Sequence, residues 1–282
     1  MLERYKMANI GTTTAFYKVE TSLTRANNEV SKSMERLATG RQNANAGDRS
    51  SYVAMSDTFR LDFAGTKAGI KGASVVMGYL ETGMRVLDAA SGLLARLQEM
   101  AVLGANETNT TADAAAIDAE AEALGDEFNR LMTASTYKGK NVFVTTAGEE
   151  YVSLGGRDAE MTFGIATIDY SALYTGGALA HTASSGAAAA TNTLTEDIEA
   201  VQKLVNTARV QAGSQYAAIE SAVSYTTDLT AQYELGFNIV NDVNFSMETA
   251  HLAKNQILQQ AATAMLAQAN QGQQGLLQLI QN

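Results

Sequence analysis

Apolar and small side chains recur every three or four residues near both ends of this 282-residue chain. In residues 12–38 the spacing alternates between three and four, which is the pattern of a coiled-coil seam. The seam positions are Phe16, Val19, Leu23, Ala26, Val30, Ser33 and Leu37. The pattern predicts one long helix with a narrow apolar stripe, followed by a connector over residues 39–50, where Gly, Asn, Asp and Ser interrupt the period.

A second periodic segment predicts another long helix that ends near residue 104. Its expected stripe consists of Val75, Tyr79, Thr82, Val86, Ala89, Leu93, Leu97 and Met100. Seven glycines lie between residues 65 and 104, and each costs about 1 kcal/mol in an exposed helix interior. Either some of these glycines permit close helix packing, or the helix is broken near residues 65–72.

A third helix is predicted after a short polar loop. Thr111 is the expected N-cap, and Asp113 lies in the first turn, where a negative charge is favourable. Because the connection is short, we expect this helix to pack antiparallel to the preceding one. Its expected buried face is formed by Ile117, Ala121, Leu124, Phe128 and Leu131.

The period changes to two after residue 141, which predicts a small β-hairpin. Residues 155–158 (GGRD) offer its turn. Residues 171–190, rich in Ala, Gly, Ser and Thr, are expected to form an exposed loop or the least ordered part of the chain. The alternating strand residues are Val142, Val144, Tyr151, Val152 and Leu154 before the turn and Met161, Phe163 and Ile165 after it.

Helical spacing resumes at Leu194 and continues almost to the C-terminus. Residues 255–282 contain nine glutamines and no charged side chain. Burying charge is costly, so this composition suits a helix enclosed by neighbours, although a polar tail is the alternative. The whole pattern predicts a mainly α chain: a long antiparallel helical bundle with a terminal coiled coil and a small β-hairpin element.

Composition narrows the function. The chain has no Pro, Cys or Trp and two histidines, His181 and His251, and neither histidine has the neighbours expected of a ligand. We therefore expect no catalytic residue, cofactor or metal. The net charge of −10, without a basic run, argues against nucleic acid. No apolar stretch is long enough to span a membrane, and the N-terminus lacks a cleavable signal, with Met7 as an alternative start.

Four segments resemble bacterial flagellin. The most specific is ETAHLAKNQILQQAATAMLAQANQ at residues 248–271, which is similar to the family's terminal signature. ERLATGRQNANAGDRSS (35–51), GLLARLQEMAVLGANET (92–108) and LGDEFNRLMTASTYKGKNVF (124–143) are similar to segments of the N-terminal half. The outer domains that many flagellins insert between their two halves are missing, so the chain resembles a minimal flagellin.

The resemblance implies a structural subunit that polymerises with copies of itself into the flagellar filament for swimming. It implies terminal inner-tube segments at 1–50 and 239–282, helical core halves at 51–140 and 194–238, and a hairpin with a short variable loop at 141–193. The termini of flagellins order against each other and against neighbouring subunits. The expected polymerisation stripe is Phe16, Val19, Leu23, Val30, Leu37, Ile257, Ala261, Ala264 and Met265.

The resemblance also implies partners. These are a flagellar export chaperone at the C-terminal helix and the hook-associated and cap proteins. The resemblance further implies export to the outside of the cell through the flagellar type III apparatus, without a cleaved signal peptide. Arg96, Glu99 and Met100 match positions that the flagellin-sensing Toll-like receptor contacts in the family. An ordinary ion pair between Arg96 and Glu99, three residues apart on a helix, is the competing explanation.

Two other functions remain open at this point. The hook–filament junction protein shares both helical ends, although the C-terminal signature and the short middle favour flagellin. A secreted binding protein or an enzyme would have to place its activity in residues 140–195, where few ionisable groups converge.

Overall fold

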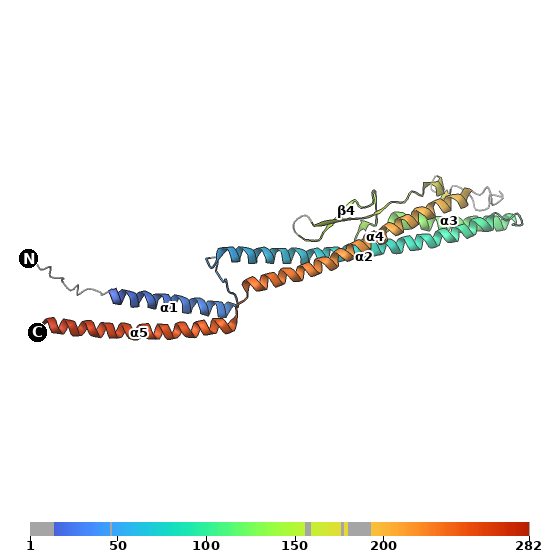
Figure 1. The fold of residues 1–282 in the computed structure, drawn as a ribbon. Helices are drawn as coiled ribbons and strands as arrows, with labels where there is room; N and C mark the ends of the chain where they lie inside the picture. The colour runs from blue at the N-terminus through green and yellow to red at the C-terminus, as the bar shows by residue number, and fades with distance from the viewer. Residues whose placement is uncertain (1–13, 46, 156–158, 176–177, 180–192, 282) are drawn as a thin grey trace, which may run out of the picture. The chain divides into compact units, whose positions relative to one another are not determined.

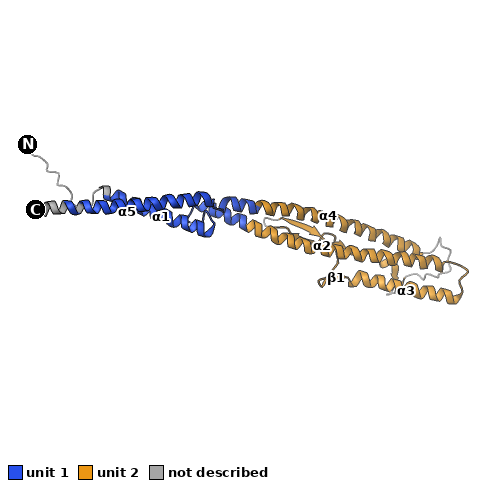
Figure 2. Cartoon of the chain, turned by 90° about the horizontal axis from the view of Figure 1, so that it is seen from below, with its two compact units in different colours: residues 1–60, 233–282 blue, residues 61–232 orange. Residues whose placement is uncertain are grey.

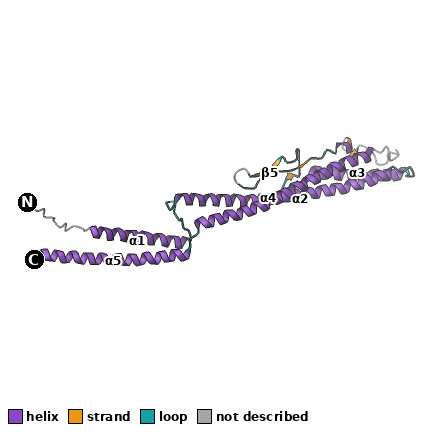
Figure 3. Ribbon diagram, viewed as in Figure 1, coloured by secondary structure: helices purple, strands orange, loops and turns teal. Residues whose placement is uncertain are grey.

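The computed structural model is mainly α-helical with a few short strands (Figure 3). Contacts divide the chain into two compact units, coloured separately in Figure 2. Unit 1 comprises residues 1–60 and 233–282, and unit 2 comprises residues 61–232. The structure describes every residue except 1–13, 46, 156–158, 176–177, 180–192 and 282. Both terminal segments expected from the sequence, 1–50 and 239–282, fall in unit 1.

Unit 1 is built on two long helices, α1 (Thr14–Thr39) and α5 (Phe245–Gln281), which lie side by side (Figure 1). They run antiparallel, because Arg36 near the end of α1 pairs with Glu248 near the start of α5, at 3.7 Å. Further along, Asn27 accepts a hydrogen bond of 2.7 Å from Gln259. The long helix predicted at residues 12–38 is thus confirmed from Thr14 onward.

The connector after α1 is fixed by backbone hydrogen bonds. Gly40 has φ +68°, a conformation that suits glycine at a helix C-terminus. The chain then forms an antiparallel bridge in which Arg41 faces Asp242, and the Gln42 N–H donates to the Asn241 carbonyl at 2.7 Å. The predicted connector is therefore an ordered turn.

Unit 2 contains α3 (Thr111–Ala134) and most of α2 (Ser50–Gly104) and α4 (Thr193–Asn241). The predicted stripe of α2 is partly wrong, because Val75 is 43% exposed and Ala89 is also exposed. The true buried stripe is rotated by about one residue and includes small side chains. It consists of Ala73, Val76, Tyr79, Leu80, Leu87, Ala90, Leu94, Leu97, Met100 and Ala101, so the predicted Tyr79, Leu97 and Met100 do belong to it.

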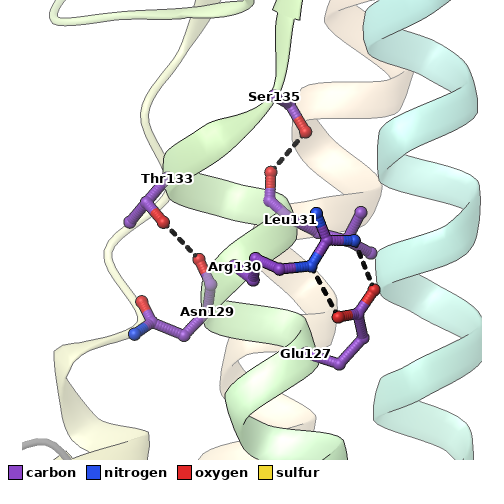
Figure 4. Close-up of polar contacts among 6 residues, drawn as sticks. All are labelled: Glu127, Asn129, Arg130, Leu131, Thr133 and Ser135. Atoms are coloured by element: carbon purple, nitrogen blue, oxygen red, sulfur yellow. Dashed lines mark hydrogen bonds and ion pairs between the residues drawn. The ribbon is translucent and has the colours of Figure 1, made fainter.

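The N-cap of α3 is Thr110, one residue before the predicted Thr111. Thr110 and Asp113 form a reciprocal capping box, so Asp113 caps the helix start rather than only placing charge there. Figure 4 shows the other end, where Arg130 makes two hydrogen bonds of 2.6 and 2.7 Å to Glu127. The Ser135 hydroxyl donates to the Leu131 carbonyl as the chain leaves the helix.

The predicted hairpin is confirmed as β4 (Glu150–Ser153) paired with β5 (Glu160–Phe163) in antiparallel register. Most of its expected turn lies outside the described residues. A parallel pair, β3 (Phe143–Val144) with β6 (Ile165–Ala166), was not predicted. Two further antiparallel pairs are β1 (Thr136–Tyr137) with β2 (Lys140–Asn141), and β7 (Tyr174–Thr175) with β8 (Ala178–Leu179).

The segment predicted as an exposed loop, 171–190, is partly ordered. A 3₁₀ turn, η1 (Ser171–Leu173), buries Leu173 in the core before β7 and β8. Residues 180–192 lie outside the described part of the chain. The expectation of an exposed loop was therefore wrong for residues 171–175 and 178–179, where Leu173 is buried and Tyr174 and Leu179 pack against the core.

The glycines of α2 do not break the helix, so the alternative of a break near residues 65–72 is wrong. A Cβ added to Gly69 would lie 2.2 Å from the backbone of Leu154, and one added to Gly83 would lie 2.2 Å from the Ile165 side chain. These glycines permit close approach, but their neighbours are strand segments rather than another helix.

Candidate functional site

The two units differ sharply in how much apolar surface they bury. The main hydrophobic core, which includes Leu80, Phe128 and Val205, lies entirely in unit 2. Among the described residues of unit 1, the buried apolar side chains are Ala26 and Ala262 between the helices and Val243 beside the connector. Apolar burial is the dominant favourable contribution to folding, so unit 1 has little stabilisation of its own.

One face of α5 packs on α1. Its residues recur at spacings of three and four, and all are half-buried except Ala262, which is buried. Ala262 of α5 and Ala26 of α1 are both buried and both line the groove between these helices. The α5 residues of this contact are Leu252, Asn255, Gln259, Ala262, Leu266 and Ala269.

A band of exposed apolar and small side chains runs from the edge of this contact round to the side of α5 that faces away from α1, and we call it the outward face of α5. Ile257 is 65% exposed, and Leu258 is 48% exposed. From Asn255 onward no charged side chain interrupts this surface. The outward face of α5 consists of Met247, Ile257, Leu258, Ala261, Ala264 and Met265.

The polymerisation stripe expected from the sequence is distributed over two surfaces. Its α5 members, Ile257, Ala261, Ala264 and Met265, are all exposed. Its α1 members are half-buried and lie on the same side of α1 as the buried Ala26, facing α5. These are Phe16, Val19, Leu23, Val30 and Leu37.

The expected polymerisation stripe did not include Leu258, and it left out Met247 although the helical period of the C-terminal segment runs through that residue. The signal was present, because residues 11 and 18 positions apart on an α-helix return to nearly the same angle. Met247, Leu258 and Met265 are spaced in this way.

A groove of about 360 Å³ runs between α1 and α5. Its α5 side is lined by Leu258, Ala261 and Met265, which belong to the outward face, and its α1 side includes Arg25 and Glu29. The outward face of α5 is thus continuous with this groove, which is apolar on its α5 side and carries the charged Arg25 and Glu29 on its α1 side.

The three positions matched to receptor contacts are separated by the fold. Arg96 and Glu99 are exposed and pair at 3.3 Å, and Arg96 also pairs with Glu120 of α3 at 3.0 Å. Met100, in contrast, is 4% exposed and belongs to the core of unit 2. The inclusion of Met100 is therefore corrected, because its side chain fills the interior between helices.

The described residues hold no group of three or more His, Cys, Asp and Glu side chains arranged to bind a metal. His251 is exposed on α5, and His181 lies outside the described residues. No helix within the described ranges has the length and apolar character needed to cross a bilayer.

Comparison with known proteins decides the family. Residues 10–147 match the model of the bacterial flagellin N-terminal helical region, and residues 194–280 match that of the C-terminal helical region. The chain belongs to the bacterial flagellin family. The two flagellin regions are separated by fewer than 50 residues, so this flagellin lacks the outer variable domain.

Individual flagellins from other bacteria match this chain along almost their whole length. The chain is 27% identical over 255 residues to "Flagellin" of Halalkalibacterium halodurans, covering 90% of this chain and 92% of the relative. It is 26% identical to "Flagellin FlaB1" of Treponema pallidum, covering 92% and 95%. It is 30% identical to "Flagellar filament core protein flaB2" of Brachyspira hyodysenteriae, covering 90% and 93%.

The prediction of a structural subunit that self-assembles into the flagellar filament is therefore confirmed. Flagellins are structural proteins rather than enzymes, and the filament that they form is exposed outside the cell. The hook–filament junction protein and a secreted binding protein are not favoured.

Proposed function

We propose that this flagellin polymerises through unit 1, with the outward face of α5 packing on other copies of the chain. The observation that carries the proposal is the contrast in burial. Unit 1 buries only three apolar side chains among its described residues, yet it exposes Ile257, Leu258 and Met265 along one helix. Complete burial of one such side chain contributes about 1.5–3 kcal/mol.

The composition of α5 supports this assignment. Ala261 and Ala264 are small, so a neighbouring helix can approach closely, and the lack of charge after residue 254 avoids the cost of desolvating ions. α1 differs, because it carries Arg25 and Glu29 on its exposed side. On this proposal, the α1 members of the stripe act indirectly, by holding α5 in place so that its outward face is available.

An Ala264→Asp substitution tests the proposal. It places a charge in the outward face, so we expect polymerisation to be abolished while unit 2 remains folded, because an unpaired charge would be buried. Ala264→Ser is the matched control, since it stays small and uncharged and should polymerise. Ala123→Asp, at an exposed position of α3, controls for added charge. Sedimentation after seeding measures assembly, and an Ala264→Asp variant that assembles like wild type refutes the proposal.

The same face is our proposed binding site for an export chaperone. A free subunit with an exposed apolar, uncharged helix would self-associate before export, so a cytoplasmic partner that covers α5 would prevent this. We propose export by the flagellar type III apparatus, and contacts with hook-associated and cap proteins at the filament ends. If the chaperone covers this face, Ala264→Asp should weaken its binding in calorimetry; unchanged affinity would place the chaperone elsewhere.

Recognition by a flagellin-sensing Toll-like receptor is a separate proposal, which the exposure of Arg96 and Glu99 supports. Reporter signalling by monomeric protein should fall for Arg96→Ala. Arg85→Ala is the matched control, because Arg85 is also exposed on α2 and forms an ion pair of 2.7 Å with Glu81. Absence of signalling by the wild-type monomer would refute receptor recognition, and an equal fall for both variants would refute the role of Arg96.

A further inference from the structure

The methionines of this chain are distributed unevenly between exposed and buried positions. Of eleven methionines, nine lie in the described residues. Five of these are buried or half-buried in unit 2. The other four are about half exposed, and every one belongs to unit 1: Met34 (56%), Met55 (48%), Met247 (60%) and Met265 (51%).

The chain contains no cysteine and no tryptophan. Methionine thioethers are therefore the side chains most readily oxidised by a two-electron oxidant such as a hydroperoxide. Because exposure governs which sulfur atoms are reached, the oxidisable sulfur of the free subunit is concentrated in the unit that mediates assembly.

Two of the four methionines lie on the outward face of α5, about 27 Å apart along the helix axis. Met247 and Met265 are 18 residues apart, which is five turns of an α-helix, so their side chains leave the helix at the same angle. Leu258 lies between them on this stripe. Met265 also lines the groove between α1 and α5, beside Ala262.

We propose that Met247 and Met265 form a reversible oxidation site that controls the assembly of this subunit. The inference rests on the proposed role of the outward face of α5. In the free subunit a hydroperoxide transfers one oxygen atom to the thioether sulfur: the O–O bond breaks, an S–O bond forms, and the remaining oxygen leaves as water or an alcohol. The resulting sulfoxide is polar, so burying it against a neighbouring copy costs more than burying the thioether.

The reaction is reversible, because a methionine sulfoxide reductase removes the oxygen as water while two thiols of its reductant are oxidised to a disulfide. An oxidised subunit would therefore be excluded from growing filaments until it is reduced. In an assembled filament the same sulfur atoms would be covered by neighbours and protected from the oxidant.

Tryptic cleavage allows each site to be measured separately. Met247 is the sole methionine of peptide 210–254, and Met265 is the sole methionine of peptide 255–282. Met34 and Met55 fall in peptides 33–36 and 50–60. Mass spectrometry of full-length monomer after treatment with hydrogen peroxide therefore reports the gain of oxygen at each of these four methionines.

The test compares three proteins before and after peroxide. Oxidised wild type should need about a tenfold higher subunit concentration to polymerise. A Met247→Leu/Met265→Leu variant should polymerise equally well with and without treatment. A Met34→Leu/Met55→Leu variant, changed at equally exposed positions of unit 1, should remain sensitive. Wild type that carries oxygen on both peptides and polymerises at its untreated concentration overturns the inference, as does a Met247→Leu/Met265→Leu variant that stays sensitive.

Reduction of oxidised wild type gives a readout that needs no substitution. Methionine sulfoxide reductase with dithiothreitol should remove oxygen from peptides 210–254 and 255–282 and restore polymerisation. Reduction of both peptides without recovery overturns the inference. The untreated Ala264→Asp variant separates this result from the proposal that the outward face of α5 mediates assembly. If that variant polymerises, the outward face is not the assembly surface. If it does not polymerise, a failed peroxide test refutes the oxidation site alone.

Discussion

Gln215 of α4 and Gly164, which lies between β5 and β6, make two hydrogen bonds to each other. The Gly164 N–H donates to Gln215 Oε1 at 3.0 Å, and Gln215 Nε2 donates to the Gly164 carbonyl at 3.2 Å. Gly164 is buried and has φ +136°, a conformation that only glycine fits. Its carbonyl also accepts from the Gly148 N–H at 3.1 Å, so its N–H is the group that depends on the Gln215 side chain. The hairpin of unit 2 is thereby attached to α4.

Replacing this amide should weaken unit 2. Gln215→Ala leaves the buried Gly164 N–H without its partner, so we expect the free energy of unfolding to fall by about 1–3 kcal/mol. Urea unfolding of the full chain measures the effect. Gln232→Ala, at an exposed position of the same helix, should change stability by less than about 0.5 kcal/mol. Equal effects of the two substitutions would contradict the role of Gln215.

The glycines of α2 predict opposite outcomes for the same substitution. Gly69→Ala would bring a Cβ to 2.2 Å from the Leu154 backbone, so we expect destabilisation of about 3 kcal/mol or more as the hairpin is displaced. Gly92→Ala meets no atom within 4 Å and should stabilise the helix by about 0.5–1 kcal/mol. Thermal unfolding of both variants tests this, and a neutral Gly69→Ala would show that the close approach is wrong.

Alkaline pH should destabilise unit 2 through buried tyrosines. Tyr79 is 4% exposed, its hydroxyl donates to the Val142 carbonyl at 2.5 Å, and burial raises its pKa to about 12. The folded state therefore favours the neutral phenol. Its stabilising effect is complete below the ordinary tyrosine pKa of about 10 and is lost as pH rises toward 12. Burial raises the pKa of Tyr174 in the same direction.

A Tyr79→Phe variant separates this titration from the hydrogen bond. At neutral pH it should be less stable by about 1 kcal/mol, because the carbonyl loses its donor. Its stability should then fall less steeply than that of wild type in urea titrations between about pH 9 and 11.5. Tyr225→Phe, at a position that is 68% exposed, should match wild type. A slope for Tyr79→Phe equal to that of wild type would contradict the assignment.

In unit 1, acid should loosen the connector. Lys32 donates to Asp48 at 2.6 Å, and this hydrogen bond is the main reason that the pKa of Asp48 lies below its ordinary value. The stabilisation is present above the unfolded pKa of about 3.9 and is lost as pH falls through the folded pKa. Lys32→Gln should raise the pKa of Asp48 toward its ordinary value in a carboxyl NMR titration, and an unchanged pKa would contradict this contact.

The sequence predicted the long helices well because their period extends over many turns. It misplaced the stripe of α2 by one position, since Ala73 and Ala90 contribute to the core yet carry little hydrophobic signal. The parallel pairing of Phe143 with Ile165 was missed because two-residue strands leave too few positions for a period to be recognised.

The sequence indicated the composition of the proposed assembly surface but not which side of α5 it occupies. α5 carries apolar or small residues on nearly every side, so periodicity alone could not tell that Ala262 would face α1 and Ile257 would face outward. Met100 is a different case, because helical spacing did place it on the buried stripe of α2, and only the match to receptor contacts treated its side chain as accessible.

The central claim is that unit 1 lacks a core of its own and obtains its burial from other copies of the chain. Amide hydrogen exchange, measured on one preparation as dilute monomer and as polymerised filament, tests this most directly. The account predicts fast exchange across α1 and α5 in the monomer, strong protection of both in the filament, and little change in the core helices of unit 2. Equal protection of α1 and α5 in monomer and filament would contradict it.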